Sequence, residues 1–161
     1  MFGRLKTLIS SLIDDVQPLN QFENKDCRLA TAALLIRVAT IDGEMSEARL
    51  GKLHAVLKSR FELNDLNTSQ LIDDAIAADR NAIDLYQFTR QLKDALNDEG
   101  CRRIIKMMWE IIFVDRSANE FENNIVWRAA DLLGVPSRQR IELRQQIAAD
   151  RTASLGLPAV Q

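Results

Sequence analysis

An internal repeat is the feature that most restricts how this chain can fold. When the sequence is shifted by 73 positions, the acidic residues Asp42 and Glu47 align with Asp115 and Glu120. The surrounding apolar positions align too: Leu35 with Met108, Val38 with Ile111, Ile41 with Val114 and Leu53 with Val126. With two residues deleted, segment 76–80 also aligns with the identical segment 147–151. We therefore expect two similar units, each made of a helix, an acidic turn and two further helices.

Helical periodicity runs along the whole chain, and strand-like alternation is missing. This pattern predicts an all-α fold, a single compact bundle of seven to eight helices with an internal pseudo-duplication. The predicted helices lie at about 2–16, 24–41, 47–57, 69–80, 85–96, 99–114, 120–133 and 138–149. Ser46 is expected to begin the third helix, and Gly134 and Pro136 are expected to end the seventh. The helix at 85–96 would connect the two units.

Length and composition fit one folded domain. The chain has 161 residues, of which 47% are hydrophobic and 27% charged, as is usual for a globular protein. We divide it into an N-terminal amphipathic helix at 1–20, a helical domain at 21–150 and a flexible tail at 151–161. The net charge is −2 and no basic block stands out, which argues against nucleic acid as a partner.

Cysteine usage and hydropathy point to the cytoplasm. Cys27 and Cys101 form no CxxC motif, and two free thiols suit a reducing compartment. No stretch approaches the roughly 20 apolar residues of a membrane span. The stripe at 2–16 either packs on the bundle or a second copy, or lies on a membrane. Packing is favoured because the polar face is not rich in Lys and Arg, so peripheral membrane association is the less favoured reading.

Two acidic turns, at 41–49 and 114–122, hold the candidate functional residues. Helix capping explains many of them: Ser46 and Asn119 are suitable N-caps, and Glu122 completes a capping box. Glu47 and Glu120 would favour the positive end of a helix dipole. Capping leaves Asp42 and Glu44 less well explained. Two carboxylates so close in sequence also present oxygens to a hard cation.

Neither turn is an EF-hand. Counted from Asp42, the sixth and twelfth loop positions hold Glu47 and Leu53 instead of the required Gly and Glu. A cation site would therefore need carboxylates from both turns to converge. Catalysis is not expected, because the only histidine, His54, lies on an apolar face and no nucleophile or phosphate-loop motif is present. A metal-dependent hydrolase is the least favoured reading.

The two turns resemble the TerB-like family of tellurite-resistance proteins, whose signature is an Asp-Gly-Glu turn, a small cap and an acidic first helical turn, in two copies. Segments 84–89 and 127–135 are also similar to a bacterial branch of that family, and the resemblance covers about 24–150. It implies an all-α bundle of about seven helices and a stress or tellurite-resistance role. It further implies an acidic surface that binds divalent metal, often with membrane-associated partners.

Carried over by position, the resemblance implies metal ligands for a divalent cation such as Ca²⁺ or Mg²⁺: Asp42, Glu44, Asp115 and Glu122, with Glu47 and Glu120 as weaker candidates. The chain departs from the family pattern at Arg116, at Ser117 and at Arg49, which replaces the capping-box Glu of the first turn. Two hypotheses follow. The chain is a non-enzymatic module with a weak cation site, or it is a protein-interaction scaffold whose acidic turns only cap helices, with a protein partner or a second copy bound.

Overall fold

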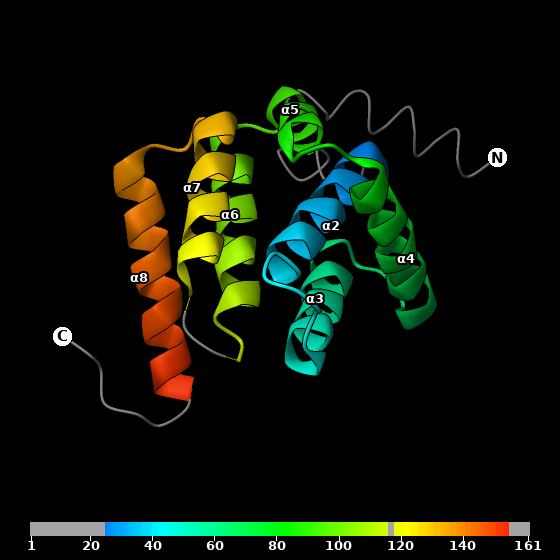
Figure 1. Cartoon of the computed structure of the whole chain (residues 1–161), viewed down its shortest axis with the longest axis horizontal. Coiled ribbons are helices and arrows are strands. Elements are labelled where there is room, and N and C mark those ends of the chain that lie inside the picture. Colours follow the sequence, from blue (N-terminus) through cyan, green and yellow to red (C-terminus); the bar gives the residue numbers. More distant parts are fainter. Residues whose placement is uncertain (1–24, 116–117, 155–161) are drawn as a thin grey trace.

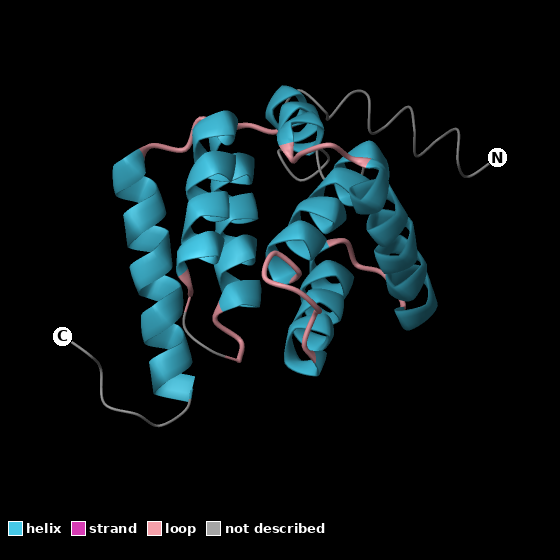
Figure 2. Ribbon diagram, in the orientation of Figure 1, coloured by secondary structure: helices cyan, strands magenta, loops and turns pink. Residues whose placement is uncertain are grey.

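Seven α-helices make up the part of the chain that the structure, a computed structural model, describes: residues 25–115 and 118–154 (Figures 1 and 2). They are α2 (Lys25–Ala39), α3 (Glu47–Arg60), α4 (Asp65–Asn81), α5 (Tyr86–Ala95), α6 (Asp98–Ile112), α7 (Glu120–Leu133) and α8 (Ser137–Ser154). No strand occurs within those residues, so the all-α prediction is confirmed. The predicted helix at 2–16 lies outside them, as do residues 155–161 of the predicted tail.

Side-chain caps decide where most of these helices begin. Ser46, Asn64, Asn97 and Asn119 each accept a hydrogen bond from a backbone N–H three residues further on, which satisfies a donor that the helix itself cannot use. The predicted caps Ser46 and Asn119 are therefore confirmed. The start predicted near residue 69 is wrong, because the Asn64 cap begins α4 at Asp65.

Local interactions also determine where helix α7 ends. Gly134 adopts a left-handed conformation with φ 74°, and its N–H donates to the carbonyls of Ala130 and Asp131, so α7 ends where the sequence predicts. Helix α8 runs to Ser154, five residues beyond the predicted end at Ala149. Residues 151–154 of the predicted tail are thus helical.

The helices fall into two trios, as the repeat predicts. Helices α2, α3 and α4 form one trio and α6, α7 and α8 the other, and in each trio the first helix packs most closely on the third. Figure 1 shows the second trio on the left of the view and the first on the right. Helices α2 and α6 pack on each other between the trios, and α5 contacts both α2 and α7.

The core lies along α2 and α6. Helix α2 is buried on nearly every side, which fits a sequence that, after its first two residues, is apolar or small except at Arg28 and Arg37. Helix α6 contributes the largest side chain of the core, Trp109, which is 1% exposed and stacks on Phe113 with ring centroids 5.6 Å apart. Because α2 and α6 each lead into an acidic turn, their packing brings the two turns together.

Candidate functional site

The two acidic turns lie side by side and exchange hydrogen bonds. The Ser46 hydroxyl of the first turn donates to Asp115 Oδ2 of the second at 2.5 Å. The Asn119 amide of the second turn donates to Asp42 Oδ2 of the first at 3.1 Å. The cap of each repeat thus holds the leading carboxylate of the other. The convergence that a shared site requires is present.

Arg49 occupies the centre of this arrangement. It lies in the first turn of α3, yet it is only 1% exposed. Its Nη2 forms an ion pair with Glu122 Oε2, its Nε lies 3.4 Å from Asp115 Oδ1, and its Nη1 lies 4.0 Å from Asp42 Oδ1. It also donates to the carbonyls of Ala39 (3.4 Å) and Ile112 (3.2 Å), at the ends of α2 and α6. One guanidinium therefore connects both repeats.

Glu122 is the innermost of the acidic residues. It is 0% exposed and completes the predicted capping box: its Oε1 accepts from the Asn119 N–H at 3.0 Å, and its own N–H donates to Asn119 Oδ1 at 2.8 Å. The repeat alignment places Arg49 and Glu122 at equivalent positions. Their ion pair therefore joins the same position in the two halves of the molecule.

The other predicted site residues lie nearer the solvent. Asp42, Glu44 and Asp115, together with Ser46 and Arg49, line an open cleft of about 260 Å³. Glu47 and Glu120 are exposed in the first turns of α3 and α7 and do not line this cleft. Three of the six candidate ligands thus share the cleft, Glu122 lies beneath it, and two lie outside it.

The central role of Arg49 was not predicted from the sequence, which marked this residue only as a departure from the family pattern. The sequence did contain one signal, the repeat. It aligns Arg49 with Glu122, so equivalent positions of the two repeats carry opposite charges. The burial of both positions depends on how the repeats pack. For this reason the sequence alone did not indicate an ion pair.

Asp42, Asp115 and Glu122 cannot share a metal ion while Arg49 is in place. The guanidinium lies between the carboxylates of Asp42, Asp115 and Glu122, so its charge and volume occupy the position that a shared cation would take. Across 25–115 and 118–154, no three His, Cys, Asp or Glu side chains are grouped closely enough to hold a metal. His54 is half-buried on α3, with Nε2 4.0 Å from Asp65 Oδ1, and it does not line the cleft.

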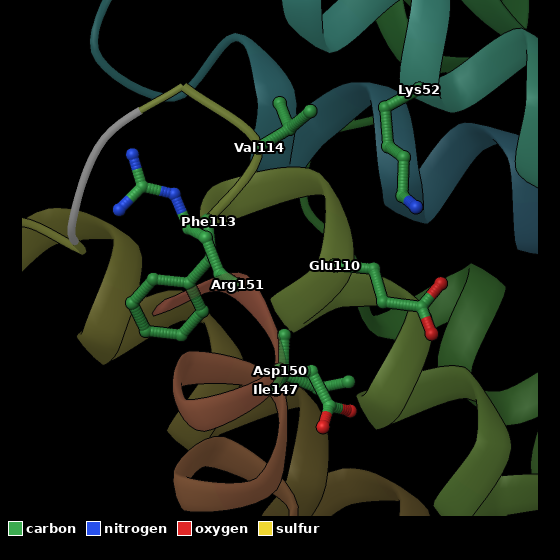
Figure 3. Close-up of a pocket in the computed structure, with 7 residues that line it drawn as sticks. All are labelled: Lys52, Glu110, Phe113, Val114, Ile147, Asp150 and Arg151. Atoms are coloured by element: carbon green, nitrogen blue, oxygen red, sulfur yellow. The ribbon is translucent and has the colours of Figure 1, made fainter. Parts of the chain in front are cut away.

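A second surface feature lies between α3 and α6. We call it the α3–α6 groove, with a volume of about 630 Å³, and it is lined by Lys52, Ala55, Val56, Ser59, Arg60, Glu62, Arg103, Lys106, Met107 and Glu110. A neighbouring cavity of about 370 Å³ shares Lys52 and Glu110 and continues to α8 through Ile147, Asp150 and Arg151 (Figure 3).

The α3–α6 groove carries a surplus of positive charge. Four cationic side chains and two carboxylates line it, although Arg103 also pairs with Glu99 at 3.4 Å. Burial, together with the nearby charge of Arg103, lowers the pKa of Arg60. This surplus contrasts with the net charge of −2 of the whole chain.

Among the described helices, none is long and apolar enough to span a membrane.

Comparisons with known proteins place the chain in a family. Searches of curated proteins and of solved structures gave no match. The family model described as tellurite resistance protein TerB matches residues 28–145, a stretch that includes both acidic turns and most of the chain. The chain therefore belongs to the TerB tellurite-resistance family.

Proposed function

We propose that this TerB-family domain is a non-catalytic protein-interaction module with a role in stress of the tellurite-resistance type. The observation that carries the proposal is the set of contacts that the acidic turns make within the fold. Their carboxylates cap helices and hold Arg49, so these contacts serve the fold and a partner would bind elsewhere. The two cysteines are both buried and form no disulfide, which supports a reducing cytoplasmic setting.

The α3–α6 groove is the surface we assign to the partner. Val56 and Met107 give it an apolar floor, and Lys52 of α3 and Lys106 of α6 both line it. Such a groove complements an amphipathic helix with acidic residues beside its apolar stripe, because opposite potentials favour encounter and orientation. We therefore infer an acidic segment of a partner protein as the ligand.

A labelled acidic helical peptide, with Leu at every third or fourth position and Glu between, tests this assignment. We expect fluorescence anisotropy to show binding that weakens as salt is added. The Lys52→Gln/Lys106→Gln variant should bind about threefold to tenfold more weakly, since each lost contact with a solvent-accessible lysine costs up to about 1 kcal/mol.

The matched control is Arg90→Gln/Lys93→Gln, which removes two exposed charges from α5, away from the α3–α6 groove. This control should bind like the native chain, and a peptide with Lys in place of Glu should not bind. Equal losses in the two double variants would mean that the peptide responds only to overall charge, and the groove assignment would be abandoned.

A second candidate function is weak binding of a divalent cation such as Ca²⁺ or Mg²⁺ by the native chain. It is supported by the open cleft, where Asp42, Glu44 and Asp115 all reach solvent. Thermal unfolding of chelator-stripped protein with millimolar Ca²⁺ or Mg²⁺ separates the two candidates. A saturable rise in melting temperature that Asp42→Asn/Asp115→Asn removes would favour the cation.

A further inference from the structure

The two walls of the α3–α6 groove come from different repeats. Helix α3 supplies one wall, which includes Lys52 and Val56, and α6 supplies the other, which includes Met107 and Glu110. The width of the groove therefore depends on how the two repeats are held together. A bound apolar stripe is sensitive to this width, because a gap of about 0.5–1 Å already removes a quarter to a half of a van der Waals contact.

Arg49 fastens one wall to the other at one end of the groove. It lies less than one helical turn before Lys52 on α3, and it donates at 3.2 Å to the carbonyl of Ile112, two residues beyond Glu110 on α6. Its Nε also lies 3.4 Å from Asp115 Oδ1, just after the end of α6. Arg49 itself does not line the groove. It connects the first turn of α3 to the last turn of α6.

At the other end of the groove the two walls carry like charges. Arg60 follows from α3 and Arg103 from α6, and burial together with the charge of Arg103 lowers the pKa of Arg60. Repulsion between the two guanidinium groups favours separation of the walls, although Glu99 and Glu110 offset part of it. The contacts of Arg49 oppose this separation.

We propose that Arg49 is a positioning residue for the partner: by holding α3 against α6, it sets the width of the α3–α6 groove. This inference rests on the proposed function, because it takes the groove as the binding surface. An arginine suits the role, since its planar guanidinium presents several N–H donors in fixed directions and can contact acceptors of both repeats at once. A lysine keeps the charge but has a single nitrogen.

Arg49→Lys in the full chain tests the proposal, with spin labels on Gly51→Cys of α3 and Glu142→Cys of α8, the helix that packs on α6. Both positions are exposed, a Cβ at Gly51 would meet no neighbouring group within 4 Å, and the native Cys27 and Cys101 are buried. We expect Arg49→Lys to shift the mean distance between the labels by about 1–2 Å and to broaden its distribution, as when a packed helix moves.

The labelled acidic helical peptide provides a second readout. Arg49→Lys should bind this peptide about threefold to tenfold more weakly than the native chain, as expected for a residue coupled to a binding site that it does not contact. Because the substitution keeps the net charge, a lower affinity would not come from a change in overall charge. Circular dichroism checks that each variant is folded under the conditions of the measurement.

The chain offers a matched control in Arg140. This arginine is also nearly buried, at 5% exposed, and it pairs with Asp131 at 2.6 Å and with the carbonyls of Trp127 and Val135. None of these residues lines the α3–α6 groove. Arg140→Lys should lose stability but keep the label distance and the peptide affinity of the native chain. Equal changes in the two variants would overturn the proposal, because any loss of a buried arginine would then have the same effect.

Failure of this inference can be told apart from failure of the proposed function, because the label distance is measured without peptide. An unchanged distance in folded Arg49→Lys would overturn the positioning role, whereas a native chain that binds no peptide would overturn the proposed function. If Arg49→Lys does not fold, Ser46→Gly takes its place. It removes the hydroxyl that donates to Asp115, and glycine remains an acceptable N-cap. A smaller shift in the label distance is then expected, and no shift would overturn the proposal.

Discussion

Arg49→Met should lower the free energy of unfolding by about 3–5 kcal/mol, the usual cost of removing one partner from a buried ion pair. The cost is expected at the upper end of what one arginine contributes, because Glu122 is 0% exposed and would lose its ion pair with the guanidinium. The carbonyls of Ala39 and Ile112 would also lose a donor. Urea unfolding at neutral pH in the presence of chelator measures the change.

The exposed Arg90 on α5 provides the comparison for this measurement. Arg90→Met removes the same charge and should change the free energy of unfolding by less than about 0.5 kcal/mol. A native domain of this kind has a free energy of unfolding of roughly 5–15 kcal/mol. Arg49→Met is therefore expected to remain folded, with a lower free energy of unfolding that can still be measured. A loss below about 1 kcal/mol for Arg49→Met would contradict the described ion pair.

Trp109→Ala should cost about 3–5 kcal/mol, the range measured when large buried aromatic side chains are truncated. The indole is 1% exposed in the last turn of α6, stacks on Phe113 and lies 5.5 Å from the Arg144 guanidinium of α8, so its loss leaves a cavity in the core beside α6. The other tryptophan is the natural control. Trp127 is 39% exposed and lies under the Arg140 guanidinium at 4.4 Å.

Trp127→Ala should therefore cost only about 1 kcal/mol, mainly the lost cation–π contact and some surface packing. Denaturant unfolding followed by circular dichroism compares the two variants without relying on tryptophan fluorescence. If both substitutions cost the same, the described burial of α6 in the core would be contradicted.

Most of the fold could be predicted from the sequence because its signals are local. The period of apolar residues marked the described helices, and Ser46, Asn119 and Gly134 marked their ends through hydrogen bonds to neighbouring backbone groups. The errors were also local. Asn64 was not recognised as a cap, and the end of α8 carries no Gly or Pro before Gly156, so its last residues had no stop signal.

The candidate site could be predicted only in part. The residues that line the cleft were identified because acidic turns have a recognisable sequence, but their grouping depends on contacts between residues 69 or 77 positions apart. In the sequence, Arg49 was marked only as a departure from the family pattern. Its burial results from the packing of α3 against the end of α6, and no local sequence pattern predicts such packing.

A double-mutant cycle between Arg49 and Glu122 tests most directly whether a buried ion pair joins the two repeats. The variants are Arg49→Met, Glu122→Gln and the combination, and Gln retains an oxygen that can accept from the Asn119 N–H. We predict a coupling energy of about 2 kcal/mol or more, so that the double variant loses much less stability than the two single losses added together. Losses that add to within about 0.5 kcal/mol would contradict the account, because they would mean that the two side chains do not interact across the repeats.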